Sequence, residues 1–325
     1  SPAALHGMGG IGKTVVARAL CEDPAVQEAF PDGILWTTLG REVTDADLRI
    51  KLREWVDALG GRVSETAPTV ARLKAVLAQL LAERACLLIV DDVWRRTHAE
   101  AFQVGGPRCR LLLTTRDAEI ARGMGARLHP VDVMETEQAV ALLAQWAGGK
   151  LGEVDQAVKI QIVVRVGCLP LAVKLAGEQL RRHDPARWLA RFDARKLQSR
   201  RPETVHDSLF QTFSLSLEDL AEEDRRCYTA LAIFQEDAPI PLVALTRLWG
   251  ALAGLDEDGT RDLMHDLAAR ALVQMDETRF SPAVTLHDLL RDFIADALGE
   301  QGVRDAHHAL LDAYRATQAG EGWHT

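Results

Sequence analysis

Several features that would place this chain outside the cell or in a membrane have no counterpart in its sequence. Its five cysteines are scattered and form no CxxC pair, so they do not suggest a disulfide framework. No uncharged apolar run approaches the roughly 20 residues that cross a bilayer, and the first residues do not follow a signal-peptide pattern. We therefore expect a cytoplasmic protein with no membrane partner.

Nor does the chain have an excess of basic charge, since 38 Lys and Arg residues stand against 47 Asp and Glu residues. The net charge is −9, and where arginines gather, at 180–201, they are interleaved with apolar residues at helical spacing. A protein that binds the nucleic-acid backbone needs a basic surface. We therefore do not expect nucleic acid to be a partner of this chain.

What the chain does have is the size and composition of an ordinary globular protein. Its 325 residues are enough for two or three compact units, and 47% of them are hydrophobic. The chain starts directly in an apolar segment and a glycine-rich loop, SPAALHGMGG, and stops soon after a new amphipathic stretch begins. We interpret it as a piece of a longer protein.

The glycine-rich segment near the N-terminus predicts a phosphate-binding loop. Residues 7–14 read GMGGIGKT, which fits the pattern GxxxxGK[ST], between a predicted strand (AALH) and a predicted helix (TVVARALCE). Glycines let backbone N–H groups face phosphate oxygens, the lysine reaches the β- and γ-phosphates, and the last hydroxyl ligates Mg²⁺. A plain glycine turn is the alternative. The predicted nucleotide contacts are Gly7, Met8, Gly9, Gly10, Ile11, Gly12, Lys13, Thr14 and Val15, and Thr14 is also a predicted Mg²⁺ ligand.

Two carboxylates follow the next strongly apolar strand. Residues 69–84 carry apolar residues at helical spacing, and CLLIVDDVW at 86–94 predicts a buried parallel strand. The carboxyl end of such a strand lies at the ligand-binding edge of an open α/β sheet. We expect Asp91 to hold Mg²⁺, directly or through water, and Asp92 to orient or deprotonate the attacking water. For both residues, a plain strand-ending turn is the alternative.

A third apolar strand predicts a residue that senses the terminal phosphate. RLLLTT at 110–115 is followed by Arg116, and a guanidinium at a strand end suits charge-assisted hydrogen bonds to phosphate. A surface salt bridge is the alternative for Arg116. Further strands are expected near 34–39 and 127–131. The front of the chain is therefore predicted to be an α/β P-loop domain, a parallel sheet with helices on both faces.

Five segments in a fixed order make a more specific pattern. They are GMGGIGKT, FPDGILWTTLG, LLIVDDVW, RLLLTTRD and GCLPLAVKLAG. Together they resemble the NB-ARC module of the STAND P-loop ATPases, the group of the apoptotic protease-activating factor and plant disease-resistance receptors. The resemblance implies a P-loop nucleotide-binding domain at 1–134, a small helical domain at 135–204 and a winged-helix domain at 205–302. Residues 303–325 would begin a further helical segment.

The resemblance also assigns residues of the later domains to the nucleotide. In the family, the proline of the GLPL segment lies against the base and sugar, which here implies Pro170 and its neighbour Leu171. A helix-starting proline without ligand contact is the alternative. Cys168 replaces the usual leucine, a change that we expect to affect mainly packing.

Two His-Asp pairs compete for a further family role, the histidine that reaches the ADP β-phosphate. His265 lies on a predicted helix whose apolar arc is formed by its neighbours, so it should be exposed. The second pair follows a predicted hairpin at 271–286 and begins a helix, with Asp288 as the expected N-cap. We therefore assign the ADP contact to His287, although a leucine replaces the methionine usual before it.

The resemblance implies a switch and not a motor. ADP would hold the domains closed, and exchange for ATP would open them and permit homo-oligomerisation. Slow Mg²⁺-dependent hydrolysis would reset the protein, since Asp92 stands where AAA-type motors usually carry glutamate. The preference for adenine rests on the resemblance alone. An N-terminal effector and C-terminal sensor repeats would belong to the longer protein.

Two other functions fit parts of the sequence. A winged helix can serve a DNA-binding transcriptional regulator, but the candidate recognition helix TRDLMHDLAARAL balances Arg261 and Arg270 against Asp262 and Asp266. An ordinary P-loop ATPase or phosphotransferase would need a polar acceptor pocket, which the residues after 134 do not suggest. Both remain alternatives to the switch.

Overall fold

Two compact units make up the structure, a computed structural model that describes residues 1–63, 66–198, 207–235, 238–277 and 281–320. The first unit is Ser1–Asp132 and the second is Val133–Thr325, and each is described by itself. Within the described ranges, every helix is too short or too polar to span a bilayer. The boundary predicted between 204 and 205 lies outside the described residues.

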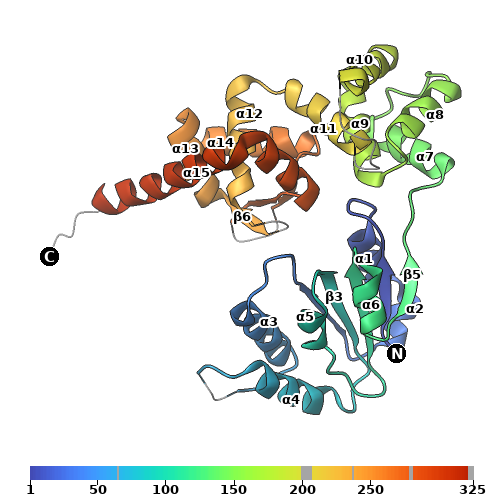
Figure 1. Cartoon of the computed structure of the whole chain (residues 1–325), viewed down its shortest axis with the longest axis vertical. Coiled ribbons are helices and arrows are strands. Elements are labelled where there is room, and N and C mark those ends of the chain that lie inside the picture. The colour runs from blue at the N-terminus through green and yellow to red at the C-terminus, as the bar shows by residue number, and fades with distance from the viewer. Residues whose placement is uncertain (64–65, 199–206, 236–237, 278–280, 321–325) are drawn as a thin grey trace. The chain divides into compact units, whose positions relative to one another are not determined.

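The first unit is built around a five-stranded sheet with the order β2-β3-β4-β1-β5, in which every neighbouring pair is parallel (Figure 1). The strands are β1 (Ala3–His6), β2 (Ile34–Thr38), β3 (Leu87–Val93), β4 (Arg110–Thr115) and β5 (Arg127–Pro130). The helices are α1 (Lys13–Glu22), α2 (Pro24–Ala29), α3 (Asp45–Ala58), α4 (Val70–Leu81), α5 (Arg96–Glu100) and α6 (Ala118–Gly123). All five segments predicted to be strands are strands.

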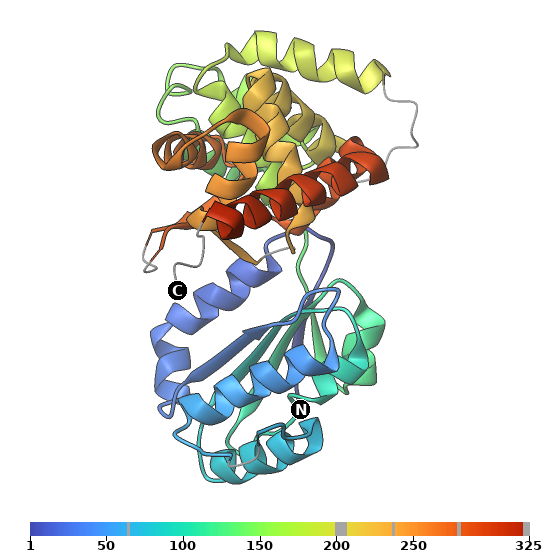
Figure 2. The same ribbon diagram turned by 90° about the vertical axis from the view of Figure 1, so that its left-hand side faces the viewer.

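Apolar side chains alternate along β3 and reach both faces of this sheet. Leu88 and Val90 join a core with residues of α3, α4, α5 and α6, whereas Leu87 and Ile89 join a second core with Ala17 of α1. Figure 2 shows helices on both sides of the strands. A strand that is buried on both faces reads as an unbroken apolar run, which is why β3 was predictable. The α/β fold class predicted for the front of the chain is confirmed.

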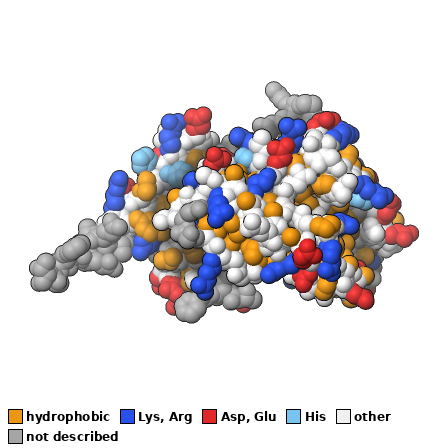
Figure 3. Space-filling model, turned by 90° about the horizontal axis from the view of Figure 1, so that it is seen from below, with side chains coloured by type: hydrophobic (Ala, Val, Ile, Leu, Met, Phe, Trp, Pro, Cys, Tyr) orange, Lys and Arg blue, Asp and Glu red, His pale blue; other side chains and the backbone are white. Residues whose placement is uncertain are grey.

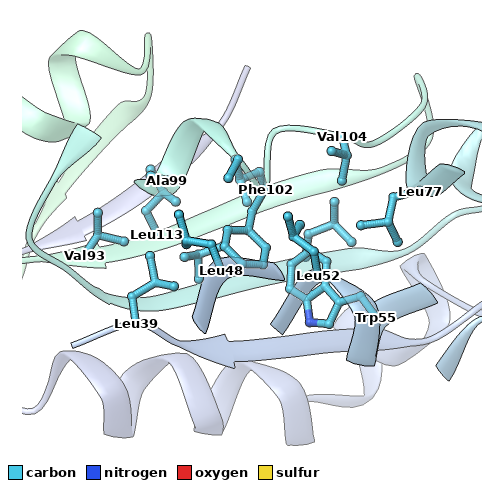
Figure 4. Packing of buried hydrophobic residues seen from close by; sticks show 14 of the residues in the cluster. Leu39, Leu48, Leu52, Trp55, Leu77, Val93, Ala99, Phe102, Val104 and Leu113 are labelled. Atoms are coloured by element: carbon cyan, nitrogen blue, oxygen red, sulfur yellow. The ribbon is translucent and has the colours of Figure 1, made fainter. Parts of the chain in front are cut away.

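The larger core fixes the sheet against α3 and α4 (Figure 4). The rings of Trp55 and Phe102 meet edge to face, with 4.9 Å between centroids and 70° between planes. Leu52 and Leu77 are fully buried in the same cluster. Burial of each such side chain stabilises the fold by roughly 2 kcal/mol. This packing holds the strands, and therefore the residues at their carboxyl ends, in fixed positions.

The second unit is mainly helical (Figure 1). The backbone is non-helical at Gly299 (φ 69°, ψ 168°), so the label α15 covers two helical segments. A short 3₁₀ helix, Ala230–Ile233, follows α12. The helices are α7 (Thr136–Trp146), α8 (Gln156–Arg165), α9 (Pro170–Leu180), α10 (Pro185–Gln198), α11 (Asp207–Glu218), α12 (Glu222–Thr229), α13 (Leu242–Ala253), α14 (Glu257–Ala269) and α15 (Asp288–Gly320).

A small antiparallel sheet with the order β6-β8-β7 completes this unit. Its strands are β6 (Pro239–Pro241), β7 (Gln274–Asp276) and β8 (Ala283–Thr285). The hairpin predicted at 271–286 corresponds to β7 and β8, and α15 follows it. Strand β6 was not predicted, because two prolines in three residues resemble a loop, although proline is tolerated in an edge strand such as this one. The winged-helix assignment stays a prediction.

Candidate functional site

The glycine-rich loop joins β1 to α1 at the carboxyl end of the sheet. Three of its glycines have φ angles that other residues rarely adopt, namely Gly7 at 156°, Gly10 at 72° and Gly12 at 96°. A Cβ at Gly7 would lie 2.5 Å from the carbonyl oxygen of Val131, whereas nothing lies within 4 Å of one at Gly12. Close packing therefore requires glycine at position 7. At position 12 the backbone requires it, and open space is left beside the N-terminus of α1.

The side chain of Lys13 turns back over this loop. Its ammonium group donates to the carbonyl oxygens of Gly7 and Met8, both at 2.9 Å. Burial and, to a smaller extent, the nearby charge of Arg116 lower the pKa of Lys13 to about 8, although the charges of Asp92 and Asp91 act in the opposite direction. An ammonium group in this position can neutralise the charge of a phosphate bound by the loop.

The remaining loop residues face different surroundings. Gly9 and Ile11 are buried in the loop, and Gly10 is half-buried. Val15, in the first turn of α1, is 68% exposed, so a nucleotide contact at this position would use the backbone N–H. The nucleotide contacts predicted for these residues stay predictions.

Hydroxyl groups from three segments surround the carboxylate of Asp91. Thr14 Oγ1 donates to it at 2.9 Å, Thr114 Oγ1 at 2.6 Å and Thr38 Oγ1 at 3.5 Å. Burial raises the pKa of Asp91, and the hydrogen bonds from Thr114 and Thr14 lower it. A carboxylate beside a hydroxyl is the kind of oxygen pair that Mg²⁺ prefers, so Thr14 and Asp91 suit the metal role predicted for them.

Asp92 leaves the regular geometry of β3. The pairing with β4 shifts register at this point, and Asp92 has a left-handed backbone with φ 53°. Its N–H donates to Thr114 Oγ1 at 2.8 Å, and its Oδ2 accepts from the indole N–H of Trp94 at 2.8 Å. The two neighbouring carboxylates therefore have different partners, hydroxyls for Asp91 and an indole for Asp92.

Arg116 lies against an aromatic ring that the sequence did not single out. Its guanidinium carbon is 4.8 Å from the centroid of the Trp94 ring, and that of Arg41 is 4.4 Å away. The hydroxyl of Thr115 donates to the carbonyl of Val93 at 2.7 Å, so it supports the sheet. Arg41 and Trp94 were missed because the order of the strands brings them together, and spacing along the chain does not show that order.

In the second unit, Pro170 and Leu171 begin α9, with Pro170 at the first helical position. The preceding helix, α8, ends in a left-handed turn formed by Gly167 (φ 71°) and Cys168 (φ 50°). Their N–H groups donate to carbonyls of α8 at 3.1 and 2.9 Å, the pattern of a Schellman motif. Cys168 therefore matters through its backbone conformation, and its effect on packing stays a prediction. The nucleotide contacts of Pro170 and Leu171 stay predictions.

His287 stands at the corner between β8 and α15. Its carbonyl accepts the first helical hydrogen bonds, from Leu290 at 3.0 Å and Arg291 at 2.9 Å, so His287, and not Asp288 as predicted, is the N-cap. The Asp288 carboxylate is buried, 2.7 Å from His287 Nδ1, and it accepts from the Leu289 N–H at 2.6 Å. The same N–H is farther from Nδ1, at 3.2 Å, so the carboxylate is its acceptor. A carboxylate at this place favours a proton on Nδ1.

The other candidate histidine has different surroundings. The His265 side chain is 55% exposed on α14, 3.8 Å from Glu277. Its neighbours Met264 and Leu267 are fully buried, as the helical periodicity predicted.

The surface charges of the described residues do not favour DNA. On α14, Arg261 pairs with Glu257 at 2.8 Å and Arg270 pairs with Asp266 at 2.6 Å. On the face shown in Figure 3, the described Lys and Arg side chains are mixed with Asp and Glu. A DNA-reading helix would present unpaired basic residues on one side.

Comparison with known proteins connects the candidate site to a family. The family model described as the NB-ARC domain matches residues 3–151. This part of the chain matches the NB-ARC domain. It contains the glycine-rich loop, both carboxylates and Arg116, and it reaches into the second unit as far as the segment after α7. The resemblance predicted from the five ordered segments is confirmed.

Individual relatives match most of the chain, including the part that the domain model does not cover. Apoptotic protease-activating factor 1 of Danio rerio is 29% identical, over 96% of this chain and 25% of that protein. Disease resistance protein RPP8 of Arabidopsis thaliana is 27% identical, over 89% of this chain and 34% of that protein. The chain therefore spans about a quarter to a third of the length of these relatives.

A solved structure shares the fold. It is a Signal Transduction ATPase with Numerous Domains (STAND) protein with a tetratricopeptide repeat sensor from Pyrococcus horikoshii. The match covers 96% of this chain and 43% of that chain, with a TM-score of 0.60 and 15% sequence identity. At this identity, the likeness extends to the fold alone.

Proposed function

We propose that this chain is a nucleotide-controlled switch that binds ADP or ATP with Mg²⁺ and hydrolyses ATP slowly. One observation carries the proposal: Lys13 lies over the glycine-rich loop while the Thr14 hydroxyl lies 2.9 Å from the buried carboxylate of Asp91. A nucleoside triphosphate and its metal need backbone N–H groups around the phosphates, a cation and hard oxygen ligands. These residues bring all three together. The match of residues 3–151 to the NB-ARC domain model supports the same role in nucleotide binding.

Binding would use the residues from Gly7 to Val15. Lys13 would exchange its bonds to the loop carbonyls for bonds to the β- and γ-phosphates, and Thr14 and Asp91 would hold Mg²⁺. The metal supplies charge neutralisation on the phosphate oxygens. Adenine is proposed from the family alone.

Hydrolysis would use Asp92 and Arg116. The oxygen of a water molecule attacks the γ-phosphorus, the bond to the bridging oxygen breaks, and ADP and phosphate leave. Asp92 would orient this water and accept its proton, and Arg116 would stabilise the charge on the γ-phosphate. Aspartate is one methylene shorter than glutamate, so we expect slow turnover that resets the switch.

A latch, meaning the set of contacts that keeps the ADP-bound form closed, would come from the second unit. Its residues would belong to the helical domain at 135–204 and the winged-helix domain at 205–302. Pro170 and Leu171 would lie against the base and sugar, and His287 Nε2 would contact the ADP β-phosphate while Asp288 holds the proton on Nδ1. ADP would keep the domains closed. ATP would release this contact and permit homo-oligomerisation in the cytoplasm. In the longer protein, an effector would precede these domains and sensor repeats would follow them.

The test is to denature the purified protein and identify the released nucleotide by ion-exchange chromatography. We expect near-stoichiometric ADP from the wild type, none from Lys13→Ala, and the wild-type amount from Lys150→Ala, which removes an exposed lysine of the second unit. Wild-type protein that carries no nucleotide and binds neither added ADP nor added ATP would overturn the proposal. Tight binding retained by Lys13→Ala would contradict the phosphate-loop assignment.

A further inference from the structure

Trp94 connects the ends of three neighbouring strands. It directly follows β3 and is half-buried. Its ring contacts the guanidinium groups of Arg41, which comes after β2, and of Arg116, which directly follows β4. Because β2, β3 and β4 are adjacent in the sheet, a single side chain contacts residues from the carboxyl ends of all three.

The same indole also holds a carboxylate. Its N–H donates to Asp92 Oδ2 at 2.8 Å. Asp92 has a left-handed backbone, with φ 53°, which a residue other than glycine keeps only when its surroundings support it. The bond from Trp94 to the side chain and the bond between the Asp92 N–H and Thr114 supply that support.

The two groups that Trp94 holds also act on the loop. The charges of Arg116 and Asp92 shift the pKa of Lys13 in opposite directions, Arg116 downward and Asp92 upward. Both groups are therefore close enough to the phosphate-binding loop for their placement to matter to a phosphate bound there. A rigid aromatic side chain between them fixes how far apart they lie.

We propose that Trp94 is a positioning residue for ATP hydrolysis. Its N–H fixes Asp92 through Oδ2, so Oδ1 is the oxygen that takes the proton of the attacking water. Its ring fixes Arg116 at the γ-phosphate, and Arg41, on the same ring, steadies the indole. This deepens the proposed function and therefore rests on nucleotide binding.

The two contacts can be separated by substitution in the full chain. Trp94→Phe keeps an aromatic face for the guanidinium groups but has no N–H for Asp92. Trp94→Leu removes both contacts. Trp146→Phe is a matched control, because Trp146 is also half-buried and has a cation, Lys174, 4.4 Å from its ring, but lies in the second unit.

The measurements are single-turnover ATP hydrolysis and the dissociation constants of ATP and ADP with Mg²⁺. We expect Trp94→Phe to hydrolyse roughly tenfold more slowly, because a misplaced base loses much of its effect, with both affinities within about twofold of the wild type. Trp94→Leu should be at least as slow and should also lose about threefold in its affinity for ATP relative to ADP, the size of an exposed cation–π contact. Trp146→Phe should match the wild type.

Three outcomes would overturn the inference. Wild-type hydrolysis in both Trp94 variants would show that the indole positions nothing. An equal loss of ATP and ADP affinity in both variants, with unchanged hydrolysis of bound ATP, would show a merely structural role. In either case, nucleotide binding by the wild-type protein would leave the proposed function standing. The third outcome, a wild-type protein that binds neither ATP nor ADP, would overturn both the inference and the proposed function.

Discussion

At the scale of single residues, Lys13 combines burial with a charge that can be lost near neutral pH. Its pKa is lowered from 10.5 to about 8. Between these values the unfolded chain binds the proton that the folded chain has released, so this residue makes stability rise with pH across that range. Phosphate binding acts in the opposite direction, because phosphate favours the charged ammonium.

This opposition gives a pH prediction. Nucleotide affinity should fall as pH rises above about 8, and binding at about pH 9 should take up protons because the phosphates raise the pKa of Lys13. Titration calorimetry in buffers with different ionisation enthalpies measures this uptake. Lys13→Arg stays charged throughout this pH range. Any nucleotide binding that this variant retains should therefore take up no protons through residue 13. An affinity in the wild type that stays constant from neutral pH to about pH 9.5 would contradict the prediction.

Motif spacing predicted the residues that follow one another along the chain, but not those brought together by the sheet. Lys13, Thr14 and Asp91 were predictable because each belongs to a local motif with a fixed chemical role. Thr38 and Arg41 were not, because only the neighbouring positions of β2 and β3 place them beside Asp91 and Trp94. The roles in nucleotide binding stay predictions.

At the scale of elements, the helix ends of the second unit depend on left-handed residues. Helix α13 ends at Gly254, which has φ 69°, and an added Cβ there would meet nothing within 4 Å. Gly254→Ala should therefore lower the free energy of unfolding by about 1 kcal/mol through backbone strain alone. Gly254→Asn should cost less, although asparagine is larger, because it tolerates the left-handed conformation. Denaturant unfolding measures both, and a smaller loss for alanine than for asparagine would contradict the strain argument.

Elements were predictable where burial or a cap made the pattern strong. The apolar runs of β3 and β4 predicted buried strands, and the stripe at 69–84 predicted α4, which spans Val70–Leu81. The start of α15 was misplaced by one residue, because the Asp288 carboxylate accepts from an N–H of the first turn, as an N-cap side chain would, while the first carbonyl acceptor is that of His287. Such one-residue choices depend on backbone angles that the sequence does not specify.

At the scale of the whole molecule, the proposed latch makes one histidine of the second unit matter to a nucleotide held mainly by the first. His287→Ala should weaken ADP binding by roughly tenfold, the effect of losing a hydrogen bond to a charged group. His265→Ala, on the exposed side of α14, should leave ADP affinity within about twofold of the wild type. Calorimetry with both variants tests this, after thermal unfolding has shown that each is folded. The reverse ranking would mean that the other histidine is the contact.

The position of β3, paired on both sides and covered on both faces, has a consequence for hydrogen exchange. Leu88, Ile89 and Val90 are at most 1% exposed, and β3 lies between β2 and β4. Amide protons at such a place exchange with deuterated solvent only when the surrounding unit unfolds. The β3 amides should therefore exchange at a rate set by the free energy of unfolding of the first unit. A bound nucleotide should slow that exchange in proportion to its concentration over its dissociation constant, so these amides report affinity without any label.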